Sequence, residues 1–328
     1  MTAARRSFAA VLLAAALALA PAPLSAQPGY PNRTITVVVP FPAGGTTDLL
    51  ARIFAQRMSE GLGQSVVVEN VGGGGGSIGA DKVAKSEPDG YTLMFHNITF
   101  STTTTALQFA GRARHGLEDF AAVSLGANVP LLLVAKKSIP ANNLKEFVAF
   151  AKQTNEPLFY GSTGPGSTLN LTGEVLKRDA GIKMEHVPFR GAAPLIQEVI
   201  AERIHFGGDQ MSSSLQHVRS GAIKAMAVQA VARAPELPDV PTVREMGYPN
   251  IELRGWNGFF VPARTPEAVV ARLHREIAAA ARHPDVQRRF AEVGAEPVGS
   301  TPAELFEVVR DQMDKVRPFV TELKLLVQ

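Results

Sequence analysis

The stretch that decides the fold is TITVVVPFPAGGTTD, residues 34–48. Residues 34–39 form a β-branched, apolar run, which is typical of a strand buried on both faces of a sheet. A turn rich in proline and glycine follows. Residues 48–62 then carry apolar side chains at helical spacing, and Gly61 and Gly63 mark the end of that segment. The stretch therefore predicts a buried strand, a tight turn and a helix.

The same alternation continues along the chain. Further strands are predicted at 66–68 and 91–95, separated by the glycine run 72–76 and a helix at 78–85. This β-α-β-α-β order implies a parallel sheet covered by helices. A second set of strands and helices is predicted at 131–134, 144–153, 158–160, 169–179, 183–187, 193–202, 204–206 and 225–228.

Two long amphipathic helices are predicted near the C-terminus. The first covers 266–282, with Thr265 as its N-cap and a proline at its first position. The second covers 302–317, with Thr301 as its N-cap. We expect Pro318 to end or kink this second helix, because proline lacks the backbone N–H that the helix needs.

The chain has 328 residues, which is enough for two domains. Residues 251–261 look extended and return the chain to the first set of strands. We therefore predict two α/β lobes with a ligand cleft between them. One lobe is discontinuous, with residues 27–128 and 252–328, and the other contains residues 129–251.

The N-terminus has the pattern of a secretory signal. Arg5 and Arg6 precede an unbroken apolar run at residues 8–20, and Ala26 offers a small residue for cleavage. The run is shorter than the roughly 20 residues that a membrane-spanning helix needs. We therefore expect residues 1–26 to be a signal peptide cleaved near Ala26. The chain has no cysteine with which to attach a lipid anchor. The expected location is the periplasm of a Gram-negative cell.

Composition excludes several classes of function. The net charge is +3, and removal of residues 1–26 would lower it to +1, so nucleic acid is not an expected partner. The absence of cysteine also excludes disulfides, thiolate metal sites and a cysteine nucleophile. The seven histidines are scattered and fit no metal-binding motif. We expect no metal and no cofactor.

Two turns carry the chemistry. Residues 40–48 and 161–168 each follow a predicted strand, precede a predicted helix, and are rich in glycine and small hydroxyl residues. Free backbone N–H groups and the partial positive charge at a helix start make such turns anion sites. One turn falls in each lobe, so the two are expected to face each other across the cleft. The alternative for the first turn is purely structural, with Thr47 as a helix cap.

Three charged residues are further candidates. Asp48 and Asp209 lie at or near predicted strand ends or helix starts, and Arg190 lies near a plausible edge of the cleft. Asp48 would either favour the helix start or orient the ligand or a bridging water. Arg190 would pair with a carboxylate or simply be solvated.

Two enzymatic interpretations are weaker. Residues 74–79 match G-x-G-x-x-G, but a run of five glycines makes the match almost automatic, and a structural loop is the preferred interpretation. Ser162 and Ser167 lack the G-x-S-x-G spacing of a hydrolase, as does Ser212, and no pattern couples them to His186 or His205. We therefore predict a binding protein and not an enzyme.

Eight segments along the chain form a recognisable set: YPNRTITVVVPFPAGGTTD (30–48), VEN with the glycine loop (68–76), PDGYTL (88–93), YGSTGPGS (160–167), VPFRG (187–191), LPDVPT (237–242), PARTP (262–266) and GAEP (294–297). Together they resemble a known family, the Bug-type periplasmic receptors of tripartite tricarboxylate transporters. The resemblance implies a type II-like periplasmic binding protein fold with two crossings between the lobes. It also implies capture of a small organic carboxylate (a di- or tricarboxylate, an acidic amino acid or an aromatic acid) by a monomer that delivers it to the permease subunits. A receptor that serves a sensor protein is the alternative, and a periplasmic hydrolase is a weaker one.

The resemblance implies a ligand held by backbone amides, small hydroxyls and ordered waters. Departures from the family pattern occur at His96, at Asn170 and through residues 95–105, so the sequence does not identify the carboxylate. The implied ligand-binding residues are Phe41, Ala43, Gly44, Gly45, Thr46, Asp48, His96, Asn97, Ser162, Thr163, Gly166, Ser167, Thr168, Arg190, Gly191 and Asp209.

Overall fold

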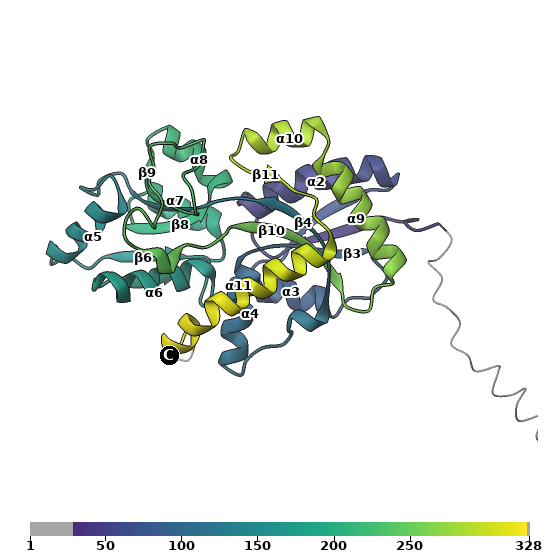
Figure 1. Ribbon diagram of the computed structural model, residues 1–328, viewed down its shortest axis with the longest axis horizontal. Helices are drawn as coiled ribbons and strands as arrows, with labels where there is room; N and C mark the ends of the chain where they lie inside the picture. Colours follow the sequence, from purple (N-terminus) through teal and green to yellow (C-terminus); the bar gives the residue numbers. More distant parts are fainter. Residues whose placement is uncertain (1–28, 327–328) are drawn as a thin grey trace, which may run out of the picture. The chain divides into compact units, whose positions relative to one another are not determined.

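Two β-sheets organise the chain in the computed structural model, which describes residues 29–326 (Figure 1). The predicted signal peptide, residues 1–26, lies outside the described residues. The strands of the first sheet are β1 (Ile35–Val39), β2 (Val66–Asn70), β3 (Thr92–Asn97), β4 (Phe120–Asn128), β10 (Trp256–Pro262) and β11 (Glu296–Pro297). The strands of the second sheet are β5 (Leu131–Lys136), β6 (Phe159–Ser162), β7 (Glu185–Pro188), β8 (Phe206–Gln210) and β9 (Ile223–Gln229).

Helices cover both sheets. With the first sheet lie α2 (Thr46–Leu62), α3 (Ser77–Ala84), α4 (Thr99–Phe109), α9 (Glu267–Ala281), α10 (Pro284–Ala291) and α11 (Pro302–Glu322). With the second sheet lie α5 (Leu144–Gln153), α6 (Thr168–Ala180), α7 (Ala192–Ile200) and α8 (Met211–Arg219). Short 3₁₀ turns are η1 (Gly74–Gly76), η2 (Leu117–Asp119) and η3 (Pro249–Ile251).

The first sheet has the order β11-β4-β10-β3-β1-β2. Strand β1 runs parallel to β2 and β3, with Val37 opposite Val68 and Leu93, which confirms the predicted parallel unit. Strand β10 comes from much later in the sequence and pairs antiparallel with both β3 and β4. Strand β4 is not predicted from the sequence, because its Ala, Ser and Gly residues have weak strand propensity. Pairing with β10 stabilises it as a strand.

Helices α2, α9 and α10 pack on one face of this sheet, and α3, α4 and α11 pack on the other (Figure 1). Phe54 of α2 anchors the first layer. Its ring meets the rings of Phe95, Phe259 and Phe290 edge-on, at centroid distances of 6.0, 5.2 and 5.3 Å. Edge-to-face aromatic packing of this kind stabilises a core beyond simple area burial.

The second sheet has the order β7-β6-β8-β5-β9. Strand β5 pairs antiparallel with β8 and β9, whereas β6 is parallel to β7 and β8. The chain crosses from the first sheet to the second between β4 and β5 and returns between β9 and β10. This is a two-lobed α/β fold, as predicted. The residue boundaries assigned above to each lobe remain a prediction.

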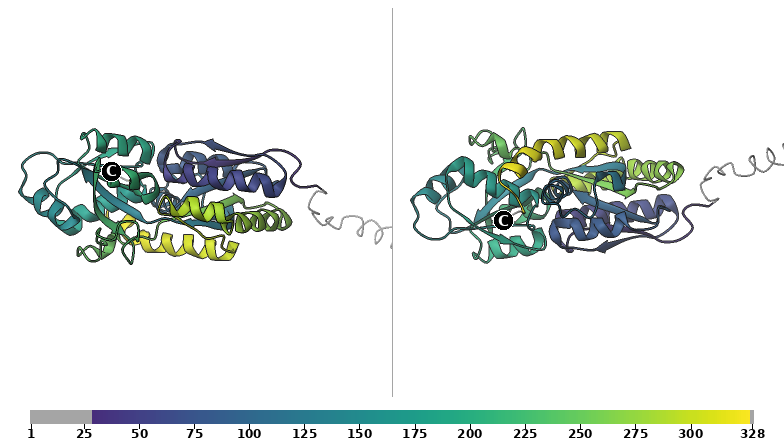
Figure 2. Two further views of the ribbon diagram at one scale, coloured as in Figure 1. Left: turned by 90° about the horizontal axis from the view of Figure 1, so that it is seen from above. Right: turned by 90° about the horizontal axis from the view of Figure 1, so that it is seen from below.

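Segments far apart in the sequence form the first lobe together. In Figure 2 the N-terminal (purple) and C-terminal (green to yellow) segments occupy the same half of the two sheets' arrangement, with the teal segments of the second sheet beyond them, and α2 contacts α9 and α10. Helix α11 packs along β4 and α4, and its end reaches α6, where Arg178 pairs with Glu322 at 2.6 Å. Among the described helices, none combines the length and apolar character needed to cross a membrane.

The structure contradicts the Thr265 cap and the expected end of the last helix at Pro318, while a kink at Pro318 stays a prediction. Thr265 does not cap α9; its Oγ1 donates to the carbonyl of Pro262 at 2.8 Å, and Pro266 occupies the cap position. Pro318 does not end α11, which continues to Glu322. Pro318 is exposed, while Val316 and Val320 beside it are fully buried, so apolar burial on both sides offsets the hydrogen bond that proline removes. Thr301 does cap α11, as predicted, in a capping box with Glu304.

The sequence analysis also does not predict helices α4, α8 and α10. Helix α4 contains four consecutive threonines, Thr102–Thr105, which are poor helix formers because β-branching restricts their side chains. All four are buried, in a helix that packs against α11, η1 and α6. Tertiary packing therefore overrides the local propensity of this segment.

Candidate functional site

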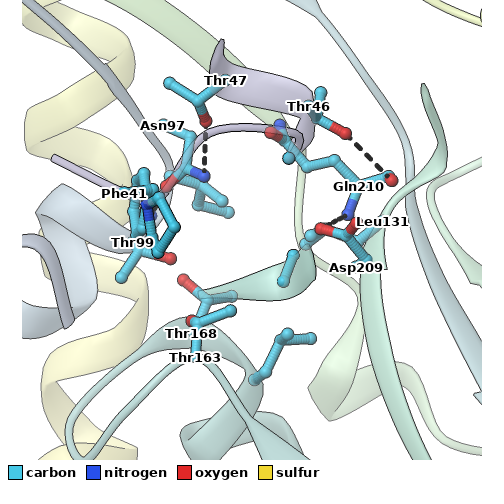
Figure 3. A pocket seen from close by; sticks show the side chains of 15 residues that line it. Phe41, Thr46, Thr47, Asn97, Thr99, Leu131, Thr163, Thr168, Asp209 and Gln210 are labelled. Atoms are coloured by element: carbon cyan, nitrogen blue, oxygen red, sulfur yellow. Dashed lines mark hydrogen bonds between the residues drawn. The ribbon is translucent and has the colours of Figure 1, made fainter. Parts of the chain in front are cut away.

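A cavity lies between the two sheets and is lined from both lobes (Figure 3). The centre of a water molecule can occupy about 30 Å³ of this cavity. The cavity therefore has room for about two waters. The lining residues are Phe41, Pro42, Gly45, Thr46, Thr47, Asn97, Ile98, Thr99, Leu131, Thr163, Thr168, Leu169, Ala192, Asp209 and Gln210.

Five of the described helices begin at this cavity. Thr46, Thr99, Thr168 and Ala192 are the first residues of α2, α4, α6 and α7, and Gln210 is the N-cap of α8. The first N–H groups of each helix have no partner within the helix, and the helix dipole adds a partial positive charge at the same end. The described lining residues include no lysine and no arginine. Backbone groups therefore make the cavity attractive to an anion.

The local sequence explains how these helix starts come close together. Gly45 caps α2 in an extended conformation, and Ser167 caps α6 by accepting a hydrogen bond from the N–H of Asn170 at 3.3 Å. Gly191 caps α7. A Cβ at Gly191 would lie 2.6 Å from Cδ of Pro42 in the other lobe, so only glycine permits this approach of the lobes.

Thr46 joins the two lobes across the cavity. Its Oγ1 lies 3.2 Å from the carbonyl oxygen of Gln210 and 3.0 Å from Oγ of Ser213, and it accepts from the N–H of Ser213 at 3.1 Å. The Thr46 side chain is buried, so these bonds form away from bulk water. They hold the start of α2 against the start of α8.

A second polar chain also crosses between the lobes. Nδ2 of Asn97 donates to the hydroxyl of Thr47, which donates to Oδ1 of Asn257, both at 3.1 Å. Nδ2 of Asn257 then donates to Gln210 at 3.1 Å, and Nε2 of Gln210 donates to the carbonyl of Trp256 at 3.3 Å. Thr47 thus links buried amides and does not cap α2. The chain fixes two amide side chains, Asn97 and Gln210, at the wall of the cavity (Figure 3).

Asp209 is the one carboxyl group among the described lining residues. Burial raises the pKa of Asp209 to about 8, and the hydrogen bond from the N–H of Gln210 acts in the opposite sense. Ser213 donates to its other oxygen. At neutral pH the side chain is therefore mainly uncharged, and a protonated carboxyl can donate a hydrogen bond.

The hydroxyl of Thr163 has no partner at the cavity within the described part of the chain. Its side chain is buried at the cavity, and its Oγ1 has no hydrogen-bond partner among the described residues. A buried polar atom without a partner costs stability unless a water or a ligand satisfies it.

Asp48 has a different role from Asp209. Its carboxylate receives hydrogen bonds from the N–H of Gly44 at 3.0 Å, from Arg52 at 3.1 Å and from Asn70 at 2.9 Å. Burial raises the pKa of Asp48, but these donors outweigh burial and leave the pKa below its usual value. Asp48 therefore holds the turn 40–48 in shape and does not line the cavity.

The structure brings seven of the sequence-predicted site residues to the cavity wall. They are Phe41, Gly45, Thr46, Asn97, Thr163, Thr168 and Asp209. Nine others lie nearby but do not line it: Ala43, Gly44, Asp48, His96, Ser162, Gly166, Ser167, Arg190 and Gly191. Most of these nine belong to the two turns, where Ser167 caps α6, whereas Gly191 lies outside them and caps α7.

His96 lies behind the cavity wall, with its ring edge-on to that of Phe41 at 5.2 Å. Its Nδ1 accepts from the N–H of Asn97 at 2.8 Å, and burial lowers the pKa of His96 to about 3, so the ring is neutral. Arg190 is exposed and has no ion pair within residues 29–326.

Sequence reasoning does not single out eight lining residues: Pro42, Thr47, Ile98, Thr99, Leu131, Leu169, Ala192 and Gln210. Most of them adjoin a residue that it does select, as Gln210 adjoins Asp209. The signal that would have found Gln210 is the helix α8, whose Ser-rich start follows directly after β8.

Ser162 does contact a histidine, which the sequence pattern does not predict. Its Oγ lies 2.6 Å from Nε2 of His186. The same hydroxyl also receives the N–H of Gly164 at 3.1 Å, and Ser162 is fully buried and does not line the cavity. Its geometry is that of a turn-stabilising serine. Among residues 29–326, no group of three or more His, Asp or Glu is placed to hold a metal ion.

Comparison with known proteins identifies relatives of the chain. The family described as "Tripartite tricarboxylate transporter family receptor" matches residues 50–325. Protein BugT of Bordetella pertussis is 32% identical over 301 residues, which is 92% of each chain.

Two solved structures from Rhodopseudomonas palustris superpose closely on the chain. MatC (Rpa3494) with bound malate is 33% identical with a TM-score of 0.83, over 89% of this chain and all of that one. Rpa4515 with adipate is 33% identical with a TM-score of 0.84, over 90% of this chain and 99% of that one. The resemblance seen in the sequence is confirmed, and the chain belongs to the receptor family of the tripartite tricarboxylate transporters.

Proposed function

We propose that this protein captures a small organic carboxylate in the cavity between its lobes and delivers it to the permease of a tripartite tricarboxylate transporter. The observation that carries the proposal is the convergence of helix starts on a cavity wall without lysine or arginine. Oriented N–H groups stabilise a carboxylate without the long-range field of a fixed cation.

The proposed ligand class is a dicarboxylate. MatC is solved with malate and Rpa4515 with adipate, and both superpose on nearly the whole chain. The two lobes contribute separate groups of donors, since Thr46 and Asn97 come from one lobe and Thr163 and Thr168 from the other. Two carboxylates at opposite ends of a short chain suit such an arrangement.

Ligand entry requires the lobes to move. The space in this structure holds about two waters, so a dicarboxylate cannot enter while Thr46 is bonded to Ser213. We propose a hinge motion at the two crossings, with boundaries at residues 128/129 and 251/252.

The remaining parts of the proposal concern the protein in the cell. Residues 1–26 act as a signal peptide with cleavage near Ala26, and the mature chain works in the periplasm as a monomer without catalysing a reaction. The hydroxyl of Ser162, the best-placed nucleophile, is buried away from the cavity.

Isothermal titration of the purified protein with a panel of carboxylates tests the capture step. We expect one-to-one binding of at least one dicarboxylate and no response to the matching diamide. At a ligand concentration of 100 times Kd, the free energy of unfolding should rise by about 2.7 kcal/mol. If no mono-, di- or tricarboxylate binds or raises the melting temperature, the proposal is wrong.

A matched pair of variants tests the location. Ala192→Glu places a carboxylate at the start of α7, inside the cavity, where it competes with the ligand for the same N–H groups. Ala268→Glu makes the same change in the first turn of α9, on the exposed surface. Binding should be lost in the first variant and kept in the second; equal affinities would place the ligand elsewhere.

A further inference from the structure

A second cavity lies within the first lobe, between α3, the end of α4 and the loop that follows it. Its volume on the same measure is about 430 Å³. It shares no lining residue with the cavity between the lobes. Six of its lining residues carry the argument: Ser77, Ile78, Asp81, Arg112, Arg114 and His115.

Two arginines that line this cavity have no side-chain partner among the described residues. Arg112 and Arg114 are exposed in the loop, and neither forms an ion pair or a side-chain hydrogen bond within the described part of the chain. Most other arginines that line no cavity are paired, as Arg33 is with Asp89 at 2.7 Å. A guanidinium offers a planar fork of donors that matches a carboxylate or a phosphate.

Two buried side-chain atoms at this cavity, one of His115 and one of Asp81, also have no hydrogen-bond partner among the described residues. His115 is only 6% exposed, and its Nδ1 has no hydrogen bond among residues 29–326; the same holds for Oδ1 of Asp81. The imidazole is held in place by Phe100, stacked at 6.3 Å, and by Phe120, edge-on at 5.7 Å. A fixed, buried and unpartnered polar group on a residue that lines a cavity favours a site for a ligand or an ordered water.

The surrounding charges limit what the site can bind. The second oxygen of Asp81 pairs with Lys85 at 2.7 Å. Glu118 and Asp119 add negative potential at His115, while burial lowers the pKa of His115 and keeps its ring neutral. A dianion in this cavity would be repelled by the three nearby acids (Asp81, Glu118 and Asp119) and attracted by only three cations, the two arginines and Lys85. A singly charged anion fits this balance better.

We propose that this cavity binds a small monocarboxylate that carries a hydroxyl group. The carboxylate lies on the guanidinium groups of Arg112 and Arg114. The hydroxyl donates to Oδ1 of Asp81 and accepts from His115, in the tautomer that carries its proton on Nδ1. Ile78, which is 55% exposed, covers the carbon chain. This site is separate from the proposed transport site, and it does not depend on the ligand bound there.

Proton–carbon NMR of the full mature chain tests the proposal, because the Cε1–H signal of His115 reports on this cavity and not on the other. The signal is identified by its loss in His115→Gln. Titration with lactate should shift it in a saturable way, and propanoate, which lacks the hydroxyl, should bind at least five-fold more weakly. Asp81→Asn should remove that difference between the two acids.

Matched variants complete the test. Arg112→Gln with Arg114→Gln should abolish the shift. Arg264→Gln with Arg282→Gln removes the same charge from exposed arginines elsewhere and should leave it intact. Calorimetry on the Ala192→Glu protein checks the result if His115→Gln fails to fold, since lactate should still bind there. Lack of any shift, persistence of the shift without Arg112 and Arg114, or tighter binding of inorganic phosphate than of lactate would overturn the proposal.

Discussion

Asp209 gives the sharpest prediction about stability. Its carboxyl is buried at the cavity without a cation, and burial raises its pKa from 3.8 to about 8. In the unfolded chain the same group ionises near its ordinary pKa. Between about pH 4 and pH 8 the native protein therefore holds a proton that the unfolded chain has released. The free energy of unfolding must fall as the pH rises through this window.

The size of the effect follows from linkage. One group that is protonated only in the native state lowers the free energy of unfolding by about 1.4 kcal/mol for each pH unit. Over the window set by the raised pKa of Asp209 the total reaches about 6 kcal/mol, as an upper bound. Asp209→Asn is nearly isosteric and cannot ionise, so it removes this contribution. Relative to wild type, the variant should become steadily more stable from pH 4 to pH 8 and then level off.

Urea unfolding of wild type and Asp209→Asn at intervals from pH 2 to pH 9 provides the measurement. Other titrating groups cancel in the difference between the two proteins. Asp48→Asn is the control of opposite sign, because the pKa of Asp48 lies below its usual value. The stability due to Asp48 is present above pH 4 and is lost as the pH falls. Parallel pH curves for wild type and Asp209→Asn would refute the assignment of a neutral, buried Asp209.

Three further outcomes follow from single contacts. Thr46→Val removes the hydroxyl between the lobes, so the radius of gyration of the ligand-free protein in X-ray scattering should increase, whereas Thr265→Val, which loses a bond within one lobe, should leave it unchanged. Gly75→Ala should lower the melting temperature more than Gly63→Ala does. Both glycines have φ near +65°, but only a Cβ at Gly75 meets neighbours, at 2.8 and 3.4 Å. Thr301→Ala removes the cap of α11 and should cost about 1 kcal/mol in chemical denaturation.

The two anion-binding turns can be predicted from the sequence because their signal is local. A buried strand, a glycine-rich turn and a helix with a small hydroxyl at its start occur within 15 residues in the first case. Strand β1 and helices α2 and α6 form close to where the pattern puts them. The hydrophobic periods of strands and helices differ, and glycine and proline mark the junctions between them.

The contribution of α7 and α8 to the cavity cannot be read in the same way. Ala192 and Gln210 are ordinary residues in their own segments, and they line the cavity because the second sheet places β7, β6 and β8 in adjacent positions. Asp48 and Asp209 show the same limit. Both are aspartates near strand ends. Asp48 accepts hydrogen bonds from three residues, and its pKa is lowered. Asp209 is buried with fewer hydrogen-bond donors, and its pKa is raised.

The sequence by itself determined the class of fold, the family resemblance and the two turns, because each depends on residues that are neighbours along the chain. The tertiary structure decided which residues face the ligand, which carboxyl is charged, and that Arg112, Arg114 and His115 surround a second cavity. Burial, electrostatic potential and hydrogen-bond partners depend on atoms brought together from distant segments, and no local pattern of residues encodes that environment.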